Sequence, residues 1–290
     1  MKSKVLIAIF FGFLFSVSAF PQSLTKENIT VKGIIVEDEN KQPLAYASIG
    51  LLNKSIGTLT DSLGNFKFQI SQDNLADTLQ ISLVGYYSKK VLVKNLIESK
   101  EHTISLRIKI TELAEVGIVN RRINTETIGR QASGKFIQVS IHNKKSSEET
   151  IGSEMGMRYK TKKTNTVLKD FSFNLSGNNF NSIKFRINIY SVKDNMPDTL
   201  IYNKQIFKTI DNFKTGWIHI DLEAYNIKVP QDFIVTVQWI ESRMDKKQDP
   251  VTLVPVAKTF FSKNCYMRIA SQDKWKRTGM NLSNFVTLIY

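Results

Sequence analysis

The sequence predicts an all-β protein made of two tandem β-sandwich modules behind a signal peptide. Short runs in which apolar and polar residues alternate recur along the chain, separated by Gly, Asn and Asp residues. This pattern is typical of strands with one buried face. No stretch shows sustained helical periodicity. We expect a signal peptide at 1–19, modules at 28–119 and 135–290, and a linker at 120–134.

The first residues have the three parts of a secretory signal. Lys2 and Lys4 supply positive charge, residues 5–15 are apolar apart from one glycine, and small residues follow up to Ala19. We place the cleavage after Ala19, with a later cut near Ser23 as an alternative. The apolar run is shorter than the ~20 residues that a membrane span needs, although an uncleaved anchor is a second alternative. We therefore expect export by Sec, no transmembrane segment in the mature chain, and a periplasmic, outer-membrane-associated or extracellular location.

The first module should contain about seven short strands. Between the third and fourth of them, Gly64 is suited to a turn position with positive φ, and Asp61 can accept hydrogen bonds from backbone amides two residues on. Phe66 and Phe68 share one strand face, and we expect them in the core. The predicted strands are 29–36, 45–52, 57–60, 66–70, 79–84, 91–93 and 103–108.

Several motifs in this module fall in the order found in one known family. They are Gly33, Pro43-Leu44, Gly57-Thr58, Asp61-x-x-Gly64-x-Phe66 and Gly85-Tyr86. The module resembles the carboxypeptidase-regulatory-like domain, a transthyretin-like β-sandwich. That resemblance implies an accessory domain and not the zinc-dependent catalytic domain of carboxypeptidases. His102, His142 and His219 lie far apart and lack metal-ligand spacing, so we expect neither a metal nor another cofactor.

Similar domains precede the plug and barrel of large outer-membrane transporters. Residues 112–116 resemble the stretch that joins the two parts there, but fewer than 180 residues follow it. A barrel of some twenty-two strands would need far more residues. We therefore expect that the chain is not the transporter itself, and docking on such a transporter is an alternative function.

Strand alternation is stronger in the second module. About nine strands in ~155 residues predict a jelly-roll-like sandwich. In the segment 183–190, Ile183 and Phe185 should face the core, whereas Lys184, Arg186 and Asn188 should face solvent. The predicted strands are 136–141, 171–175, 183–190, 199–207, 217–222, 233–239, 252–261, 265–269 and 285–289.

No catalytic constellation is recognisable. The sequence lacks a Gly-x-Ser-x-Gly elbow, a glycine-rich phosphate loop and an HExxH motif. Cys265, the only cysteine, lies in a strand-like pattern that predicts a buried, inert thiol. Asp221, Glu223 and Glu241 are expected on solvated strand faces. We therefore expect a protein that is not an enzyme, and a hydrolase with an unrecognised site is the least favoured alternative.

Charge and aromatic residues indicate a binding function. The formal net charge of +14 favours acidic partners. Aromatic rings can stack on sugars, and basic residues can hold carboxylate or sulfate groups. The candidate ligand-binding residues near the C-terminus are Tyr266, Arg268, Gln272, Lys274 and Trp275.

A turn at 271–273 would bring these candidates to one edge of the sandwich. Trp217 and Trp239 are expected in the core instead. The preferred ligand is an anionic polysaccharide. The alternative is an outer-membrane protein bound through sheet edges. No nucleic-acid-binding motif is present, and we expect no nucleic acid partner.

Overall fold

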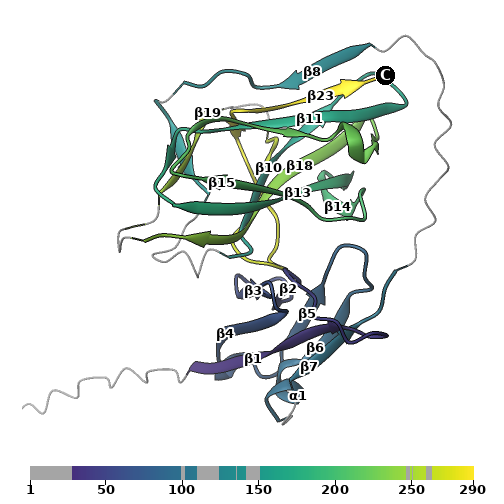
Figure 1. Cartoon of the computed structure of the whole chain (residues 1–290), viewed down its shortest axis with the longest axis vertical. Helices are drawn as coiled ribbons and strands as arrows, with labels where there is room; N and C mark the ends of the chain where they lie inside the picture. Colours follow the sequence, from purple (N-terminus) through teal and green to yellow (C-terminus); the bar gives the residue numbers. More distant parts are fainter. Residues whose placement is uncertain are drawn as a thin grey trace, which may run out of the picture.

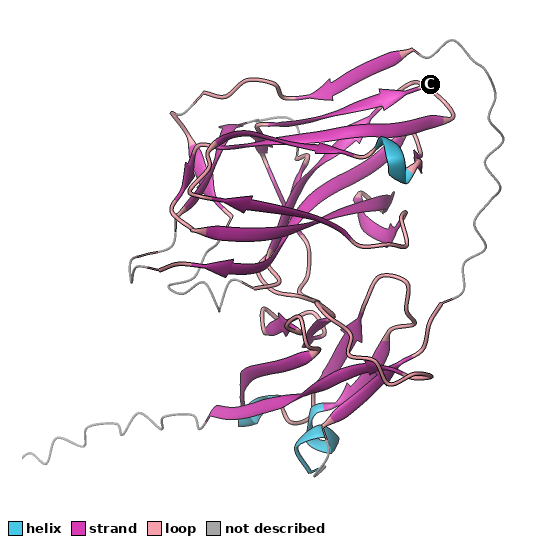
Figure 2. Cartoon of the chain, viewed as in Figure 1, coloured by secondary structure: helices cyan, strands magenta, loops and turns pink. Residues whose placement is uncertain are grey.

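The computed structural model describes residues 28–98, 102–109, 124–134, 136–141, 151–245, 249, 251–258 and 263–290. The predicted signal peptide and residues 120–123 of the predicted linker lie outside these ranges. Strands dominate the described chain, as Figure 2 shows, so the predicted all-β class is confirmed. The sequence analysis missed one short helix, α1 (Val93–Glu98), which buries Val93 and Leu96. Within the described part, no helix is long and apolar enough to cross a membrane.

The first module is a small sandwich of two sheets, drawn in purple to blue in Figure 1. Its core contains Ile35, Ile49 and Leu79, each fully buried. One sheet has the order β4 (Asn65–Ser71), β1 (Asn28–Glu37), β7 (Thr103–Leu106). The other has the order β3 (Gly57–Leu59), β2 (Ser48–Leu51), β5 (Thr78–Ser82), β6 (Lys89–Leu92).

The turn before β4 has the predicted chemistry. Gly64 has a φ of +78°, a conformation that glycine adopts without steric strain. The Asp61 Oδ1 atom accepts hydrogen bonds of 2.8 Å from the backbone N–H groups of Leu63 and Asn65. Phe66 is buried after the turn, and Phe68 packs against the same core. Local sequence therefore sets the path of the chain here.

The second module is built around two larger sheets, which we name by their position relative to the first module (Figure 1). The junction sheet has the order β14 (Met196–Leu200), β13 (Ser182–Lys193), β18 (Asp232–Arg243), β10 (Glu154–Lys160), β20 (Cys265–Arg268), β21 (Lys276–Thr278), and β15 (Ile206–Asp211) also pairs with β13. The distal sheet has the order β16 (Gly216–Asp221), β11 (Thr166–Leu175), β23 (Asn284–Ile289), β8 (Thr125–Gly129), and β17 (Ile227–Val229) also pairs with β11.

A third sheet closes one side of the second module. It consists of β12 (Gly177–Asn178), β19 (Thr252–Lys258), β22 (Met280–Leu282) and β9 (Gln138–Ser140). The core lies between the sheets and contains Phe171, Phe185 and Trp239. Cys265 is fully buried in this core, and burial raises the pKa of its thiol to about 11. The predicted inert thiol therefore agrees with its environment.

Strand β8 falls inside the segment predicted as a linker. Its residues pair with β23 from Ile289↔Thr125 to Phe285↔Gly129, and Ile128 packs against the core of the second module. The sequence predicts a linker here because the segment is polar and only one apolar residue, Ile128, marks the buried face of the strand. Residues 125–129 thus belong structurally to the distal sheet.

Candidate functional site at the junction of the modules

The outer face of the junction sheet is buried and polar. Arg186 and Asn188 on β13 are 3% and 4% exposed, and Gln238 on β18 is fully buried. The prediction that Arg186 and Asn188 face solvent is therefore wrong. Arg186 is buried because the first module covers it, and Asn188 donates hydrogen bonds to Glu154 and Gln238.

Arg186 joins the two modules. Its Nη1 atom donates to the backbone carbonyl oxygen of Tyr46 and to Gln205 Oε1, both at 2.9 Å. Its Nη2 atom donates to Ser48 Oγ at 3.3 Å and to Gln238 Oε1 at 2.6 Å, and Nε also reaches Gln238. All of these acceptors are neutral. Burial lowers the pKa of the Arg186 guanidinium to about 10, so the group stays charged at neutral pH.

Tyr46 provides two separate contacts with the second module. Its φ of +59° is a conformation that bulky residues rarely adopt. In this conformation its carbonyl oxygen accepts from Arg186, while its hydroxyl donates to Glu241 at 3.1 Å. The Nζ atom of Lys184 also donates to the Tyr46 hydroxyl at 2.9 Å and pairs with Glu241. The unusual backbone therefore coincides with the contact between the modules.

The loop before β21 forms a second contact between the modules. Gln272 donates to Ser82 Oγ at 2.7 Å and accepts from Gln80 Nε2 at 2.9 Å. Its backbone oxygen accepts from the Asn53 N–H group at 3.0 Å. Ser55 Oγ donates to Asp273 Oδ2 at 2.7 Å. Gln272, one of the predicted ligand-binding residues, is thus held by the first module.

Two glycines allow this close approach. A Cβ atom added at Gly50 would lie 2.1 Å from the backbone oxygen of Ser271, and one added at Gly57 would lie 2.6 Å from the same atom. Real Cβ atoms essentially never approach so closely. Tyr46, Leu59 and Ile240 form a small apolar cluster beside the polar contacts. An open groove of about 370 Å³, lined by residues of both modules, adjoins this cluster.

A buried ion pair lies next to Arg186 in the junction sheet. Glu154, which is 1% exposed, accepts from Arg268 Nε at 2.9 Å and Nη2 at 2.5 Å through its Oε2 atom. Its Oε1 atom accepts from Asn188, Tyr190 and Thr236. Burial raises the pKa of the Glu154 carboxyl, but the charge of Arg268 and these hydrogen bonds outweigh that effect and lower it overall.

The remaining predicted ligand-binding residues surround this ion pair. Tyr266 is fully buried, and its hydroxyl donates to the Asn195 backbone oxygen at 2.9 Å. The Arg268 guanidinium lies over the Trp275 ring at 4.6 Å from the centroid, and Tyr190 meets that ring edge-on at 5.6 Å. Trp275 is half-buried and Lys274 is exposed. The structure thus brings Tyr266, Arg268 and Trp275 together. Among the five predicted residues, Lys274 is exposed, Arg268, Gln272 and Trp275 are partly exposed, and Tyr266 is buried.

The sequence analysis did not identify Tyr46, Glu154 or Arg186 as site residues. A strand with one polar face has the same alternation whether solvent or another module covers that face. Within the described residues, no group of three His, Cys, Asp or Glu side chains is arranged to hold a metal ion. Hydrogen bonds and ion pairs connect the groups at the junction.

Comparison with known families agrees with the predicted resemblance of the first module. Residues 31–118 match the CarboxypepD_reg-like domain. A region of 90 residues is 34% identical to the TonB-dependent receptor SusC of Bacteroides thetaiotaomicron, covering 31% of this chain and 8% of the receptor. The chain thus spans less than a tenth of the length of that relative. The predicted family is confirmed for the first module.

Solved structures resemble the chain only distantly. The cysteine protease and lectin-like domains of Cwp84 from Clostridium difficile align over 90% of this chain and 62% of that one, with 8% identity and a TM-score of 0.40. A protein of infectious bursal disease virus aligns over 90% of this chain and 55% of that one, with 10% identity and a TM-score of 0.24. At these TM-scores the likeness supports no statement about function.

Proposed function

We propose that this chain is a non-catalytic binding and adaptor protein of the bacterial cell envelope. The observation that carries this proposal is the junction, in which the second module buries Arg186 against the Tyr46 backbone of the first. A partner of the CarboxypepD_reg-like module would be held in a fixed relation to any ligand of the second module. Similarity of the first module to part of a TonB-dependent receptor supports the envelope context.

The ligand we propose is an anionic polysaccharide that binds at the Trp275 edge. We define this edge as Lys274, Trp275 and Lys276, with Arg268 behind the ring. Both lysines are exposed, and the nearby carboxylate of Glu154 is already paired with Arg268. Within the described part of the chain, neither lysine forms a salt bridge, so the edge presents positive charge next to an aromatic surface, which suits a sugar carrying carboxylate or sulfate groups.

Binding of the full chain to neutral and acidic polysaccharides at low and high salt tests this proposal. The double variant Lys274→Gln/Lys276→Gln should lose most of its affinity for acidic polymers. The matched variant Lys89→Gln/Lys90→Gln, which removes two exposed lysines of the first module, should keep it. Equal loss in both variants, or complete loss with salt in the parent protein, would indicate unspecific charge attraction and refute the site. Polymer cleavage that stops after a single carboxylate substitution would refute the non-catalytic assignment.

A second candidate function is that of an accessory partner of an outer-membrane transporter. The first module favours it, because its similarity is to a receptor of that kind and because β6 forms a sheet edge with Leu92 48% exposed. Sheet edges with exposed apolar residues are common protein-docking sites. Tagged full chain should then co-purify with a membrane protein. Leu92→Lys should abolish this, and Leu200→Lys, at a similarly exposed position of the second module, should not.

A further inference from the structure

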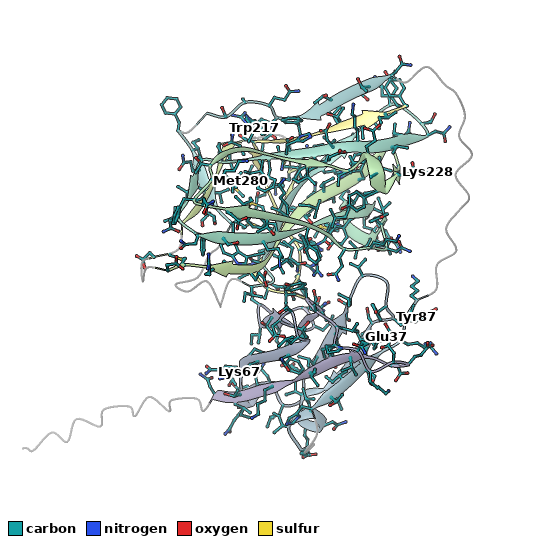
Figure 3. The ribbon with its side chains drawn as sticks, in the orientation of Figure 1. Glu37, Lys67, Tyr87, Trp217, Lys228 and Met280 are labelled. Carbon is teal, nitrogen blue, oxygen red and sulfur yellow. The ribbon has the colours of Figure 1, made fainter. Side chains whose placement is uncertain are left out.

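On the side away from the core, the distal sheet carries a polar and aromatic face that is exposed at His219 and Asp221 and buried at its centre, on β11. On β11, Phe171 and Phe173 enter the core, so Asp170, Ser172 and Asn174 point outward. The neighbouring strands β16 and β23 place Trp217, His219, Asp221, Phe285 and Thr287 on the same face. Figure 3 labels Trp217 in this upper sheet, far from the first module.

Strand register arranges these side chains in rows. Asp170 lies opposite Asp221 on one side and Thr287 on the other. Ser172 lies opposite His219 and Phe285 and contacts His219 Nδ1 at 3.0 Å. The face therefore combines aromatic rings with hydroxyl, imidazole and carboxylate groups.

Two aromatic rings form the apolar part of this face. The centroids of Trp217 and Phe285 lie 5.1 Å apart, with an interplanar angle of 59°. Both residues are half-buried, and neither belongs to the core of the second module. The prediction that Trp217 lies in the core is therefore wrong, whereas the same prediction for Trp239 is confirmed. Strand alternation places Trp217 on the face opposite to Ile218 and Ile220.

One carboxylate oxygen of Asp170 accepts no hydrogen bond from the described residues. Its side chain is only 9% exposed, and its Oδ1 atom has no hydrogen-bond partner among the described residues. It also lies directly opposite Asp221, and like charges in this relation destabilise a sheet. A buried polar atom without a partner is unfavourable unless a ligand or water satisfies it. Two facing carboxylates repel anions but accept hydrogen bonds from neutral hydroxyl groups.

We propose that this face, the Trp217 platform, binds a neutral saccharide. The C–H face of a sugar ring would pack on Trp217 and Phe285, and its hydroxyl groups would donate to Asp170 and Asp221. Trp275 lies on the opposite side of the core, next to the junction sheet. The Trp217 platform is thus separate from the Trp275 edge, and its ligand is uncharged.

Calorimetric titration of the full chain with linear hexaoses of glucose, mannose and galactose tests this inference. At least one hexaose should bind with an affinity that is the same at low and high salt. Trp217→Ala should weaken this binding about tenfold or more, which corresponds to about 1.4 kcal/mol. Tyr87→Ala, which removes an exposed aromatic ring of the first module, should leave it unchanged.

Asp170→Asn separates a binding role from a structural one. The substitution keeps the shape of the side chain and removes one of two facing carboxylates, so the melting temperature should stay equal or rise. Hexaose affinity should fall about tenfold in the same variant. A lower melting temperature with unchanged affinity would overturn the inference, as would binding of Ca²⁺ alone at this face in place of hexaose. The Lys274→Gln/Lys276→Gln variant should bind hexaose normally, which keeps this result independent of the Trp275 edge.

Discussion

The guanidinium of Arg186 in the second module donates a hydrogen bond of 2.9 Å to the backbone carbonyl oxygen of Tyr46 in the first. Both residues of this contact are buried: Arg186 is 3% exposed and Tyr46 is 9% exposed. A buried cation that bonds to acceptors from both modules depends on their docking. It therefore couples the stability of one module to the presence of the other.

Replacement of Arg186 should weaken the junction. Arg186→Met keeps much of the side-chain volume but removes the donor to the Tyr46 carbonyl and to Gln205, and it leaves Gln238 with Asn188 as the donor to its Oε1 atom. We expect the free energy of unfolding to fall by about 2–4 kcal/mol. Urea unfolding followed by circular dichroism would measure this loss. Lys193→Met, an exposed substitution on the same strand, is the control. Equal stability of the two variants would contradict the proposed role of Arg186 in joining the modules.

A single methyl group should separate the modules at the second contact. Gly50→Ala places a Cβ atom 2.1 Å from the Ser271 backbone oxygen, so one strand or the loop must move. We expect a loss of about 1–3 kcal/mol, the usual effect of overpacking. Small-angle scattering should show a larger radius of gyration. Gly134→Ala, which meets no atom within 4 Å, should change neither quantity.

Glu154 should make stability depend on acidic pH. Its pKa is lowered in the folded protein, so the native state keeps the carboxylate charged where the unfolded chain already binds a proton. The stabilisation is complete above the unfolded pKa of ~4.3 and is lost as pH falls through the lower native value. The free energy of unfolding, measured at decreasing pH, should therefore fall, and the slope of this fall against pH is the quantity to compare. In Glu154→Gln the slope should be smaller, and an unchanged slope would assign the effect to other carboxylates.

Cys265 should resist alkylation in the native protein. Its thiol is fully buried, and burial raises its pKa to about 11, so little reactive thiolate exists at neutral or mildly basic pH. Iodoacetamide should label the chain slowly without denaturant and rapidly in urea. Because the chain contains one cysteine, the mass increase measured by mass spectrometry reports labelling of Cys265 alone. Rapid labelling of the native protein would show that this edge of the junction sheet opens.

Local sequence signals accounted for the strands with the clearest alternation. The segments 29–36, 183–190 and 233–239 correspond to β1, β13 and β18. The segment 199–207 was predicted as one strand but contains the end of β14 and the start of β15, which both pair with β13. Short or polar elements such as β8 and β17 were missed, because long-range pairing and not a local pattern holds them.

The sequence by itself determined the all-β class, the family of the first module and the turn at Asp61 and Gly64. Those features depend on side-chain period and on backbone conformations that few residues tolerate. Only the tertiary structure decided what each polar strand face meets. Arg186 and Asp170 both occupy polar positions of alternating strands, yet Arg186 lies buried under the first module, while Asp170 lies on the outward face of the distal sheet with Trp217. Alternation distinguishes the two faces of a strand, but it carries no information about which neighbour covers each face. The packing of the modules therefore decides where the junction and the Trp217 platform lie.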